Sequence, residues 1–285
     1  MSENSSAAAT FGPTHIIEPV KAHTHTAILL HGRGSNGQEF AQELFGETKL
    51  SDQTSLAEKL PSWRWVFPSS PELWSTAFQE EMPAWFEAHS LTDIAARQDL
   101  QIPGIKESII YIKTIVNKEI ENLDGDSTKV VLGGISQGGA VGMWTFLCLN
   151  HPDKQLGAFF GTNTWLPFAS NIERHFHQGQ SLAAPNEGEH DESDVFVADM
   201  LKESLAQPRE AFLQTPIFLG HGTDDAYVDV QLGRQAQHVL TGIGFAVEWK
   251  EYLGAELEGH WIKSPEEVDD LLEFFVKHVE HSCIA

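Results

Sequence analysis

The chain has 285 residues, of which 41% are hydrophobic and 21% are charged, and this ordinary globular mix excludes wholesale disorder, collagen-like repeats and disulfide-dense miniature scaffolds. The length suits one large α/β domain or two small ones. With 18 Lys and Arg against 41 Asp and Glu, the net charge is −23, which disfavours nucleic acid and anionic lipid as partners.

The sequence indicates neither a membrane anchor nor an oxidising environment. No apolar run approaches the roughly 18 residues that cross a bilayer, and the segment from Met1 lacks the basic and apolar parts of a secretory signal. The two cysteines, Cys148 and Cys283, do not suggest a disulfide framework, and Cys283 stands third from the end, where prenylation needs the fourth place. We therefore expect a cytoplasmic protein without integral membrane association.

The first part of the chain predicts two strands and a helix after a loose beginning. Residues 1–22 are rich in Ser, Ala, Thr and Pro, and we expect them to form a flexible N-terminal arm. Apolar runs over 26–30 and 63–67 predict buried strands, the first of which ends in a glycine-rich segment. Isoleucine and valine at spacings of three and four predict a helix over 105–120.

The remaining elements continue this alternation of strands and helices. Further strands are predicted over 129–134, 158–160, 216–220 and 246–250, and further helices over 138–149 and around 268–279. Such alternation predicts an α/β fold with a doubly wound, mainly parallel sheet flanked by helices. We expect it to form a single domain over 23–285.

One compositional break interrupts this domain at about 169–214. Five acids occur in the eight residues from Glu187 to Asp194, and no Lys or Arg lies between Arg174 and Lys202. A stretch of this kind buries little apolar surface, so we expect an exposed, mobile acidic insertion.

The segment Gly134-Ile135-Ser136-Gln137-Gly138 matches the G-x-S-x-G pattern of a nucleophile elbow. In such an elbow a tight turn from strand to helix holds the serine in a strained conformation, and the glycines leave room for close packing. A Val-Val-Leu strand precedes Ser136 and a helical pattern follows it, so we interpret Ser136 as the nucleophile rather than as an incidental serine in a turn.

A serine hydroxyl needs a base, and the base needs an orienting carboxylate. In this type of fold the acid and then the histidine follow the serine in the chain. The strand over 216–220 runs into a loop with Asp224 and Asp225, either of which can be the acid. His260, after the last strand, is the best candidate for the base among 14 histidines.

The oxyanion hole requires backbone N–H groups aimed at the developing negative charge. One donor is expected to be the N–H of Gln137, directly after the nucleophile. The other is expected from the loop after the first strand, with the N–H of Arg33 as the candidate.

Together, these residues resemble the acyl-protein thioesterase and carboxylesterase family of small α/β-hydrolases. The resemblance extends from about residue 26 over nearly the whole chain. Its motifs are His31-Gly32-Arg33-Gly34, Met82-Pro83-Ala84-Trp85-Phe86, Gly133 to Ala140, Trp165-Leu166-Pro167, His221-Gly222 with Asp225 and Val228, and His260. The family's spacing favours Asp225 over Asp224 as the acid. It also implies that Trp85, Phe86, Trp165 and Leu166 lie beside the acyl-binding groove.

The chain departs from the family's pattern at several places, two of which bear on the substrate. Arg33 stands where the family usually has a small or apolar residue, and it either favours anionic acyl groups or forms a salt bridge at the mouth of the site. The insertion over 169–214 has no counterpart in compact members, and it could cap the site.

Other clusters are interpreted more plainly. Trp63 and Trp65 fit core packing, whereas Trp74 joins the candidates for the substrate groove. His175, His177, His190 and Asp191 have spacings that also fit a polar loop, so we expect no metal. His23 and His25 fit strand alternation or a solvated segment.

The sequence thus predicts a serine hydrolase that cleaves carboxylic esters or thioesters through an acyl-enzyme on Ser136, without a cofactor. The expected partner is a small-molecule ester or an acylated substrate, and the chain is expected to be a monomer or a weak homodimer. Two alternatives remain: a specialised esterase or acyltransferase acting on a secondary metabolite, and a non-catalytic binding protein built on a hydrolase fold.

Overall fold

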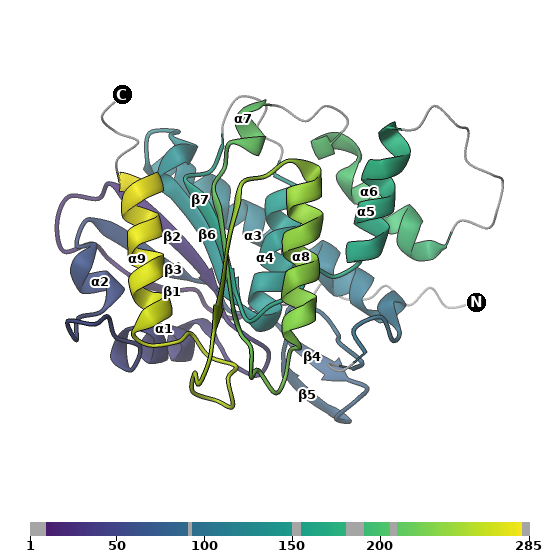
Figure 1. Ribbon diagram of the computed structural model, residues 1–285, viewed down its shortest axis with the longest axis horizontal. Coiled ribbons are helices and arrows are strands. Elements are labelled where there is room, and N and C mark those ends of the chain that lie inside the picture. Colours follow the sequence, from purple (N-terminus) through teal and green to yellow (C-terminus); the bar gives the residue numbers. More distant parts are fainter. Residues whose placement is uncertain (1–9, 91–92, 150–154, 181–190, 206–209, 281–285) are drawn as a thin grey trace.

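A computed structural model describes residues 10–90, 93–149, 155–180, 191–205 and 210–280. Seven strands form one sheet in the order β1-β3-β2-β6-β7-β8-β9 (Figure 1). They are β1 (His15–Ile17), β2 (His25–Leu30), β3 (Trp63–Phe67), β6 (Val130–Ile135), β7 (Ala158–Thr162), β8 (Ile217–Gly222) and β9 (Val247–Tyr252). Every neighbouring pair is parallel except β1 and β3. The predicted mainly parallel sheet is therefore confirmed.

Helices cover both faces of this sheet (Figure 1). On one face lie α1 (Gly37–Gly46), α2 (Leu56–Lys59) and α9 (Glu266–His278), and on the other lie α3 (Gln101–Asn122), α4 (Ser136–Leu147) and α8 (Val230–Ile243). Successive residues of β2 explain the two layers, because Ala27 and Leu29 pack with the first group whereas Ile28 and Leu30 pack with the second. The buried β2 thus carries no polar face.

The chain's first described residues belong to the sheet rather than to a loose arm. β1 pairs antiparallel with β3, His15 lying opposite Phe67, and the ring of Phe11 stacks on that of Tyr111 at 3.9 Å. The expected arm over 1–22 thus includes an ordered edge strand, which three residues are too short to signal by alternation. Residues 1–9 lie outside the described residues.

The acidic segment over 169–214 also differs from the expectation. It contains α5 (Ala169–Gln180), α6 (Glu192–Leu205) and α7 (Glu210–Leu213). Ile172, Val197 and Leu201 are fully buried, and the ring of Phe196 lies 5.0 Å from that of Trp144 on α4. The expectation that this segment buries little is therefore wrong for its described part, because a few apolar residues at helical spacing outweigh the acidic average.

The loops after β2 and β8 are fixed by caps at the helices that follow them. The side chain of Asn36 accepts hydrogen bonds from the N–H groups of Gln38 and Glu39 at the start of α1. Asp229 accepts one from the N–H of Gln231 at the start of α8. Such caps satisfy N–H groups that a helix leaves unpaired in its first turn, so both loops have defined ends.

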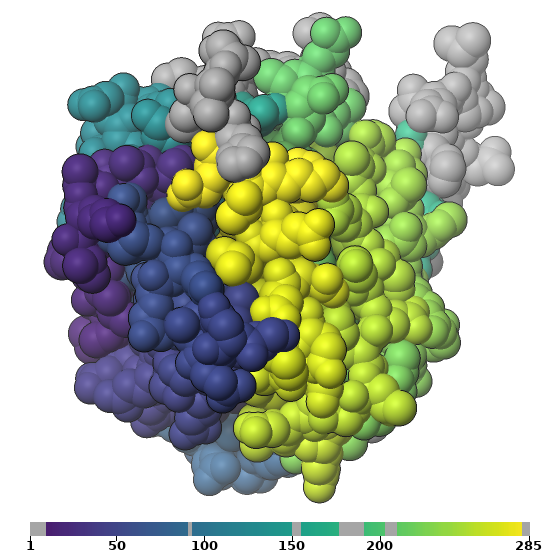
Figure 2. Space-filling view, turned by 60° about the vertical axis from the view of Figure 1, so that its left-hand side comes forward, coloured from purple at the N-terminus to yellow at the C-terminus, as the bar shows by residue number. Residues whose placement is uncertain are grey.

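The C-terminal part of the chain packs directly against its N-terminal third (Figure 2). The indole of Trp261 donates to the hydroxyl of Thr48 (2.8 Å), and the indole of Trp63 donates to Glu280 (2.6 Å). Ser264 Oγ accepts from the N–H of Lys49 at 3.1 Å and donates to its carbonyl oxygen at 2.7 Å. These contacts hold the segment that carries His260 in place from its C-terminal side.

Glu267 on α9 is a fully buried carboxyl group at the back of this segment. Its Oε2 accepts a hydrogen bond from the N–H of Lys263 (2.9 Å), and its Oε1 lies against the backbone of Gly220. Burial, with a smaller contribution from the nearby charge of Asp270, raises the pKa of Glu267 to about 8. The carboxyl group is therefore protonated in the folded protein at neutral pH.

This burial predicts a pH dependence of stability. Between the ordinary carboxyl pKa and about 8, the folded chain binds a proton that the unfolded chain has lost, so stability falls as the pH rises. The slope contributed is up to about 1.4 kcal/mol of unfolding free energy per pH unit. Thermal unfolding between pH 6.5 and pH 8 should show a decline in Tm that is shallower in Glu267→Gln, and equal slopes in the two proteins would show that Glu267 does not cause the decline.

Two further features of the described residues concern membrane association and thiol chemistry. No helix there is long and apolar enough to cross a membrane. Cys148 is a buried free thiol, and burial raises its pKa to about 12, which makes it a poor nucleophile. Cys283 lies outside the described residues.

Candidate active site

Ser136 stands at the turn where β6 ends and α4 begins, as the elbow motif predicts. Its φ of 54° lies in the left-handed region, which a non-glycine residue rarely adopts. A Cβ at position 138 would come within 2.2 Å of the carbonyl oxygen of Leu30 and 2.4 Å of that of His31. Gly138 is therefore required so that α4 can approach the end of β2, and the strained turn presents Ser136 at the carboxyl edge of the sheet.

Ser136 opens onto a pocket of about 540 Å³ at this edge. The lining comes from the loop after β2, from α1, from β6 and α4, from the loops after β7, β8 and β9, and from the hairpin of β4 (Glu72–Ser75) and β5 (Glu80–Pro83). Its walls are mainly apolar and include Phe40, Phe78, Met82, Ile135, Trp165, Val228, Leu257 and Trp261. Polar groups gather around Ser136, with His260, Gln137 and Arg33 on the same lining. The pocket thus combines an apolar wall with a reactive polar corner.

His260 reaches this pocket from the loop after β9 and is oriented by Asp225. The Nδ1 of His260 donates a hydrogen bond to Asp225 Oδ2 at 2.7 Å. The side chain of Asp225 is fully buried, and its Oδ1 accepts from the N–H groups of Tyr227 (2.8 Å) and Val228 (2.9 Å). Hydrogen bonds of this number hold the carboxylate in one orientation, so Nε2 of His260 is left as the free ring nitrogen.

Asp224 has a different role, although it is the immediate neighbour of Asp225. Its carboxylate is exposed and accepts from the N–H of Gly254 at 3.0 and 3.2 Å. It therefore ties the loop after β8 to the loop after β9. The two acids that the sequence pattern could not distinguish thus have different contacts in the structure, and it is Asp225 that lies beside His260.

Ser136 and His260 line the same pocket, but no direct hydrogen bond joins them among the contacts of the described residues. The imidazole is 16% exposed, and the ring of Tyr227 lies 5.3 Å from it. Hydrogen bonds between a nucleophile and its base are often long or poorly aligned in unliganded enzymes and tighten when substrate binds. The arrangement therefore brings the candidate nucleophile, base and acid to one pocket. The hydrogen bond between Ser136 and His260 is the contact that has still to form.

His31 fixes the loop in which the second oxyanion donor is expected. Its Nε2 accepts a hydrogen bond from the N–H of Ser70 (3.0 Å), so Nδ1 carries the proton and donates to the carbonyl oxygen of Gly32 (2.6 Å). Burial lowers the pKa of His31 to about 4, which keeps the ring neutral. A Cβ at position 32 would lie 3.8 Å from Ser136 Oγ, so the loop passes directly beside the nucleophile.

Gln137 has a structural role in addition to its backbone N–H, which lies in the unpaired first turn of α4. Its side-chain oxygen accepts from the N–H of Trp85 (2.9 Å), and its amide nitrogen donates to the carbonyl oxygen of Phe86 (2.7 Å). The indole of Trp85 in turn donates to the carbonyl oxygen of His31 (2.9 Å). These bonds connect the elbow, the loop after β2 and the segment after β5.

The aromatic residues predicted to line a substrate groove are only partly placed there. Trp165 lines the pocket, whereas Trp85, Phe86 and Leu166 are buried in the core and absent from its walls. Trp74 is 52% exposed on β4 and also does not line the pocket. Trp74 and Phe86 line a smaller pocket that shares Arg33 and Met82 with this one, whereas Trp85 and Leu166 belong to the core beneath the site. Phe78, Met82 and Tyr227 line the pocket instead, without a motif that marks them.

Asn163 and Thr164 are positioning residues that the sequence does not reveal. Asn163 donates from Nδ2 to the carbonyl oxygen of Trp261 (2.9 Å) and accepts at Oδ1 from the N–H of Gly222 (2.7 Å). It therefore connects the loop of His260 with the end of β8. Thr164 donates to the carbonyl oxygen of Ser136 (2.7 Å) and supports the elbow. No local pattern marks either residue.

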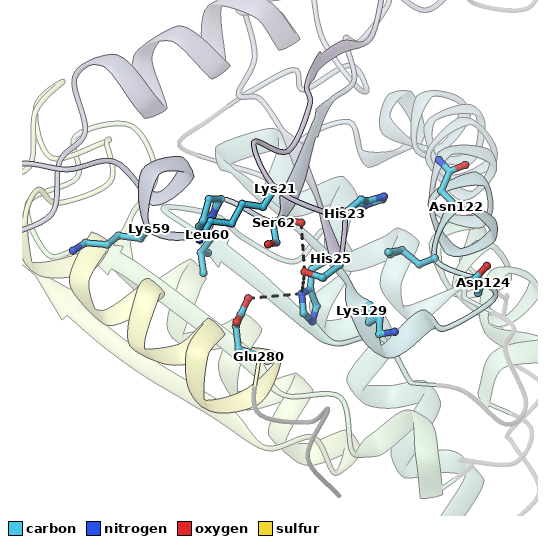
Figure 3. A pocket seen from close by; sticks show the side chains of 13 residues that line it. Lys21, His23, His25, Lys59, Leu60, Ser62, Asn122, Asp124, Lys129 and Glu280 are labelled. Carbon is cyan, nitrogen blue, oxygen red and sulfur yellow. Dashed lines mark hydrogen bonds and ion pairs between the residues drawn. The ribbon is translucent and has the colours of Figure 1, made fainter.

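A second pocket, of about 600 Å³, lies at the opposite, amino-terminal end of β2 and β6 (Figure 3). It includes His25, whose Nδ1 lies 3.7 Å from Glu280 and whose pKa is lowered by burial. Lys59 and Lys129 on its rim are ion-paired with Asp52 and Asp126. No serine with a strained backbone lies on this lining.

The histidines considered for a metal do not form a site that the structure can describe. His175 lies on α5, but the side chain of His177 and all of His190 fall outside the described residues. Asp191 is exposed at the start of α6, where it accepts a hydrogen bond from the N–H of Ser193. In the part of the chain that is described, no group of three or more His, Cys, Asp or Glu is arranged to hold a metal ion.

Comparison with known proteins agrees with this geometry. A family model described as phospholipase/carboxylesterase matches residues 12–208. Acyl-protein thioesterase 1 of Gibberella zeae is 28% identical over 261 residues (90% of this chain and 92% of the relative), and that of Debaryomyces hansenii is 28% identical over 250 (87% and 88%). The crystal structure of Zea mays acyl-protein thioesterase 2 superposes with a TM-score of 0.65 at 23% identity, covering 94% of this chain and 99% of that one.

Proposed function

The chain belongs to the phospholipase/carboxylesterase family of α/β-hydrolases, and on that premise we propose that this serine hydrolase of esters or thioesters works through Ser136, His260 and Asp225. The observation that carries the proposal is the hydrogen bond of 2.7 Å from His260 to the buried Asp225. His260 lines the same pocket as Ser136, which stands in its strained turn. No ester-cleaving role is proposed for the other pocket.

The first chemical step is attack of Ser136 on the acyl carbonyl. Its Oγ forms a bond to the carbonyl carbon while Nε2 of His260 takes the hydroxyl proton, which gives a tetrahedral oxyanion and an imidazolium. Asp225 stabilises that imidazolium through Nδ1. Because Tyr227 and Val228 already donate to its other oxygen, the carboxylate stays in place as the charge develops.

The oxyanion is held by the backbone N–H groups of Gln137 and Arg33. Gln137 is the residue after the nucleophile, and Arg33 follows Gly32, the residue whose backbone passes beside Ser136. The hydrogen bonds of His31 and the bond from the N–H of Gly34 to the carbonyl oxygen of Pro83 (2.8 Å) keep this loop in position. The site therefore needs little reorganisation when the oxyanion forms.

Collapse of the tetrahedral adduct breaks the bond to the leaving alkoxide or thiolate, which receives the proton from His260. Water then attacks the acyl-enzyme with His260 as the base, and the acid product leaves. The apolar wall of the pocket, with Ile135, Trp165 and Val228, is suited to an acyl chain. The proposed substrates are small-molecule esters or acylated molecules, and the cytoplasmic setting and the weak dimer stay predictions.

A panel of p-nitrophenyl esters and matching acyl thioesters of graded chain length tests this function. We expect kcat/KM to rise from the acetyl compound as longer acyl chains fill the apolar wall, and to fall once the chain exceeds the pocket. Added primary alcohols should not divert most of the acyl group from water, as they would in an acyltransferase. If the folded protein hydrolyses no member of the panel, the proposed function is wrong.

A further inference from the structure

Arg33 is a half-buried residue on the lining of the pocket that contains Ser136. Its Nη1 donates to the carbonyl oxygen of Ala88 (3.3 Å), and its Cζ lies 4.9 Å from the centre of the Phe78 ring, which is 54% exposed. A guanidinium carries five N–H donors in a fork that matches a carboxylate. Most of these donors therefore remain available to a ligand.

No described carboxylate forms an ion pair with this guanidinium. Glu43 lines the same pocket without pairing with it, and Glu87, which lines a smaller pocket together with Arg33, accepts instead from the N–H of Thr76 (2.9 Å). The salt bridge that the sequence left open for Arg33 is thus not formed among the described residues. The lack of a described carboxylate partner for Arg33 is unexpected, because the chain has 41 acidic residues and only 18 basic ones.

Keeping a cation half-buried and without a counter-ion costs free energy. Burial lowers the pKa of Arg33, which is the sign of that cost, yet the group remains charged at neutral pH. The cost is recovered if an anion binds beside it. The pocket offers no other unpaired cation among its described lining residues, since His260 is bonded to Asp225.

The position of Arg33 relates this cation to the reacting group of a substrate. Gly32, its neighbour, lies beside Ser136 Oγ, and Gly34 on its other side is bonded to Pro83 on β5. The β4–β5 hairpin supplies Phe78 and Met82 to the same lining. The backbone of Arg33 therefore stands next to the elbow, and its guanidinium lies against Phe78, a hairpin residue that lines the same pocket.

We propose that Arg33 makes this site selective for esters or thioesters that carry a carboxylate, so that the substrate class is the half-ester of a dicarboxylic acid or an ester with an acidic leaving group. The inference rests on the proposed function, because the carboxylate is recognised in the pocket where Ser136 reacts. The apolar wall contacts the carbon chain, and the guanidinium binds the carboxylate through paired N–H donors.

Two matched pairs of substrates test the proposal. For the acyl side, p-nitrophenyl hexanoate is compared with the mono-p-nitrophenyl ester of hexanedioic acid, which differs only by its terminal carboxylate. For the leaving-group side, the hexanoate ester of 4-hydroxybenzoic acid is compared with that of its methyl ester. In the wild-type protein, kcat/KM should favour the anionic member of at least one pair by about 10-fold to 100-fold, the range for a hydrogen bond to a charged group.

Variants then assign this preference to the guanidinium. In Arg33→Gln the anionic-to-neutral ratio of kcat/KM should fall by about 10-fold or more, and Arg33→Lys should restore part of it. Because the anionic and the neutral substrate are compared within one variant, any effect on the oxyanion donor changes both kcat/KM values and cancels in their ratio. Lys21→Gln is the matched control, because Lys21 is an exposed cation at the far pocket and its loss lowers the net charge equally. That control should leave the ratio unchanged.

Equilibrium binding separates this inference from the proposed function. Hexanedioic acid monoamide and hexanamide cannot be turned over as esters, and calorimetry should give the anionic amide a Kd about 10-fold lower in the wild-type protein but not in Arg33→Gln. Equal Kd values for the two amides, together with equal kcat/KM for the anionic and neutral members of both ester pairs, would overturn the inference. Absence of all ester hydrolysis with retained anion binding would overturn the proposed function alone.

Discussion

Ser136→Ala is expected to lower kcat/KM for p-nitrophenyl butyrate by at least about 10⁴-fold, the scale of loss when the nucleophile of a serine triad is removed. The physical reason is that the acyl-enzyme cannot form, whereas the oxyanion donors remain and support only residual hydrolysis. Steady-state kinetics with enzyme concentrations fixed by absorbance give the measurement.

The fold should be retained in this variant. The Ser136 hydroxyl has no hydrogen bond among the contacts of the described residues, and alanine meets the same left-handed backbone that serine already adopts. A Tm close to that of the wild-type protein is therefore expected. Ser170→Ala, on an exposed part of α5, is the control. Retention of wild-type hydrolysis in Ser136→Ala would rule out Ser136 as the nucleophile.

Asp225→Asn should reduce kcat by about 10³-fold to 10⁴-fold. The asparagine oxygen can still accept from the N–H groups of Tyr227 and Val228, so its NH₂ group faces Nδ1 of His260. The imidazole then has to accept at Nδ1, which places its proton on Nε2 and removes the lone pair that the nucleophile needs. The loss should appear in kcat more than in KM.

Asp224→Asn is the matched control because it makes the same chemical change one residue away. Asp224 is exposed and, among the described residues, its carboxylate accepts only from the N–H of Gly254, which an asparagine oxygen can also do. We expect its kcat to stay within a few-fold of the wild-type value. Equal losses in the two variants would mean that the loop, rather than the contact of Asp225 with His260, determines activity.

The sheet and the elbow could be predicted from the sequence because their signals are local. Apolar runs such as 26–30 and 129–134 must be buried on both faces, and the glycines around Ser136 reflect a turn of a few residues. β2 and β6 consequently lie within a residue or so of the predicted ranges. Composition was a poorer guide to α6, where Val197 and Leu201 pack into the core despite the surrounding acids.

The contacts that complete the site are not local, and they could not be predicted in the same way. Asn163 donates a hydrogen bond to the carbonyl oxygen of Trp261, 98 positions away in the sequence, and Gln137 donates one to that of Phe86, 51 positions away. Pattern analysis also could not separate an aromatic residue of the pocket wall from one beneath it. Trp85 belongs to the core and Phe78 to the wall, and only the path of the β4–β5 hairpin decides this.

Covalent labelling with a fluorophosphonate tests directly whether Ser136 is an activated nucleophile, because the reagent reports a hydroxyl that a neighbouring base has activated. We expect one adduct per chain by intact mass, located on Ser136 by peptide mapping, with labelling slowed strongly in His260→Ala and Asp225→Asn but not in Asp224→Asn. A folded wild-type protein that takes up no label, or takes it up at another residue, would show that Ser136 is not the activated nucleophile.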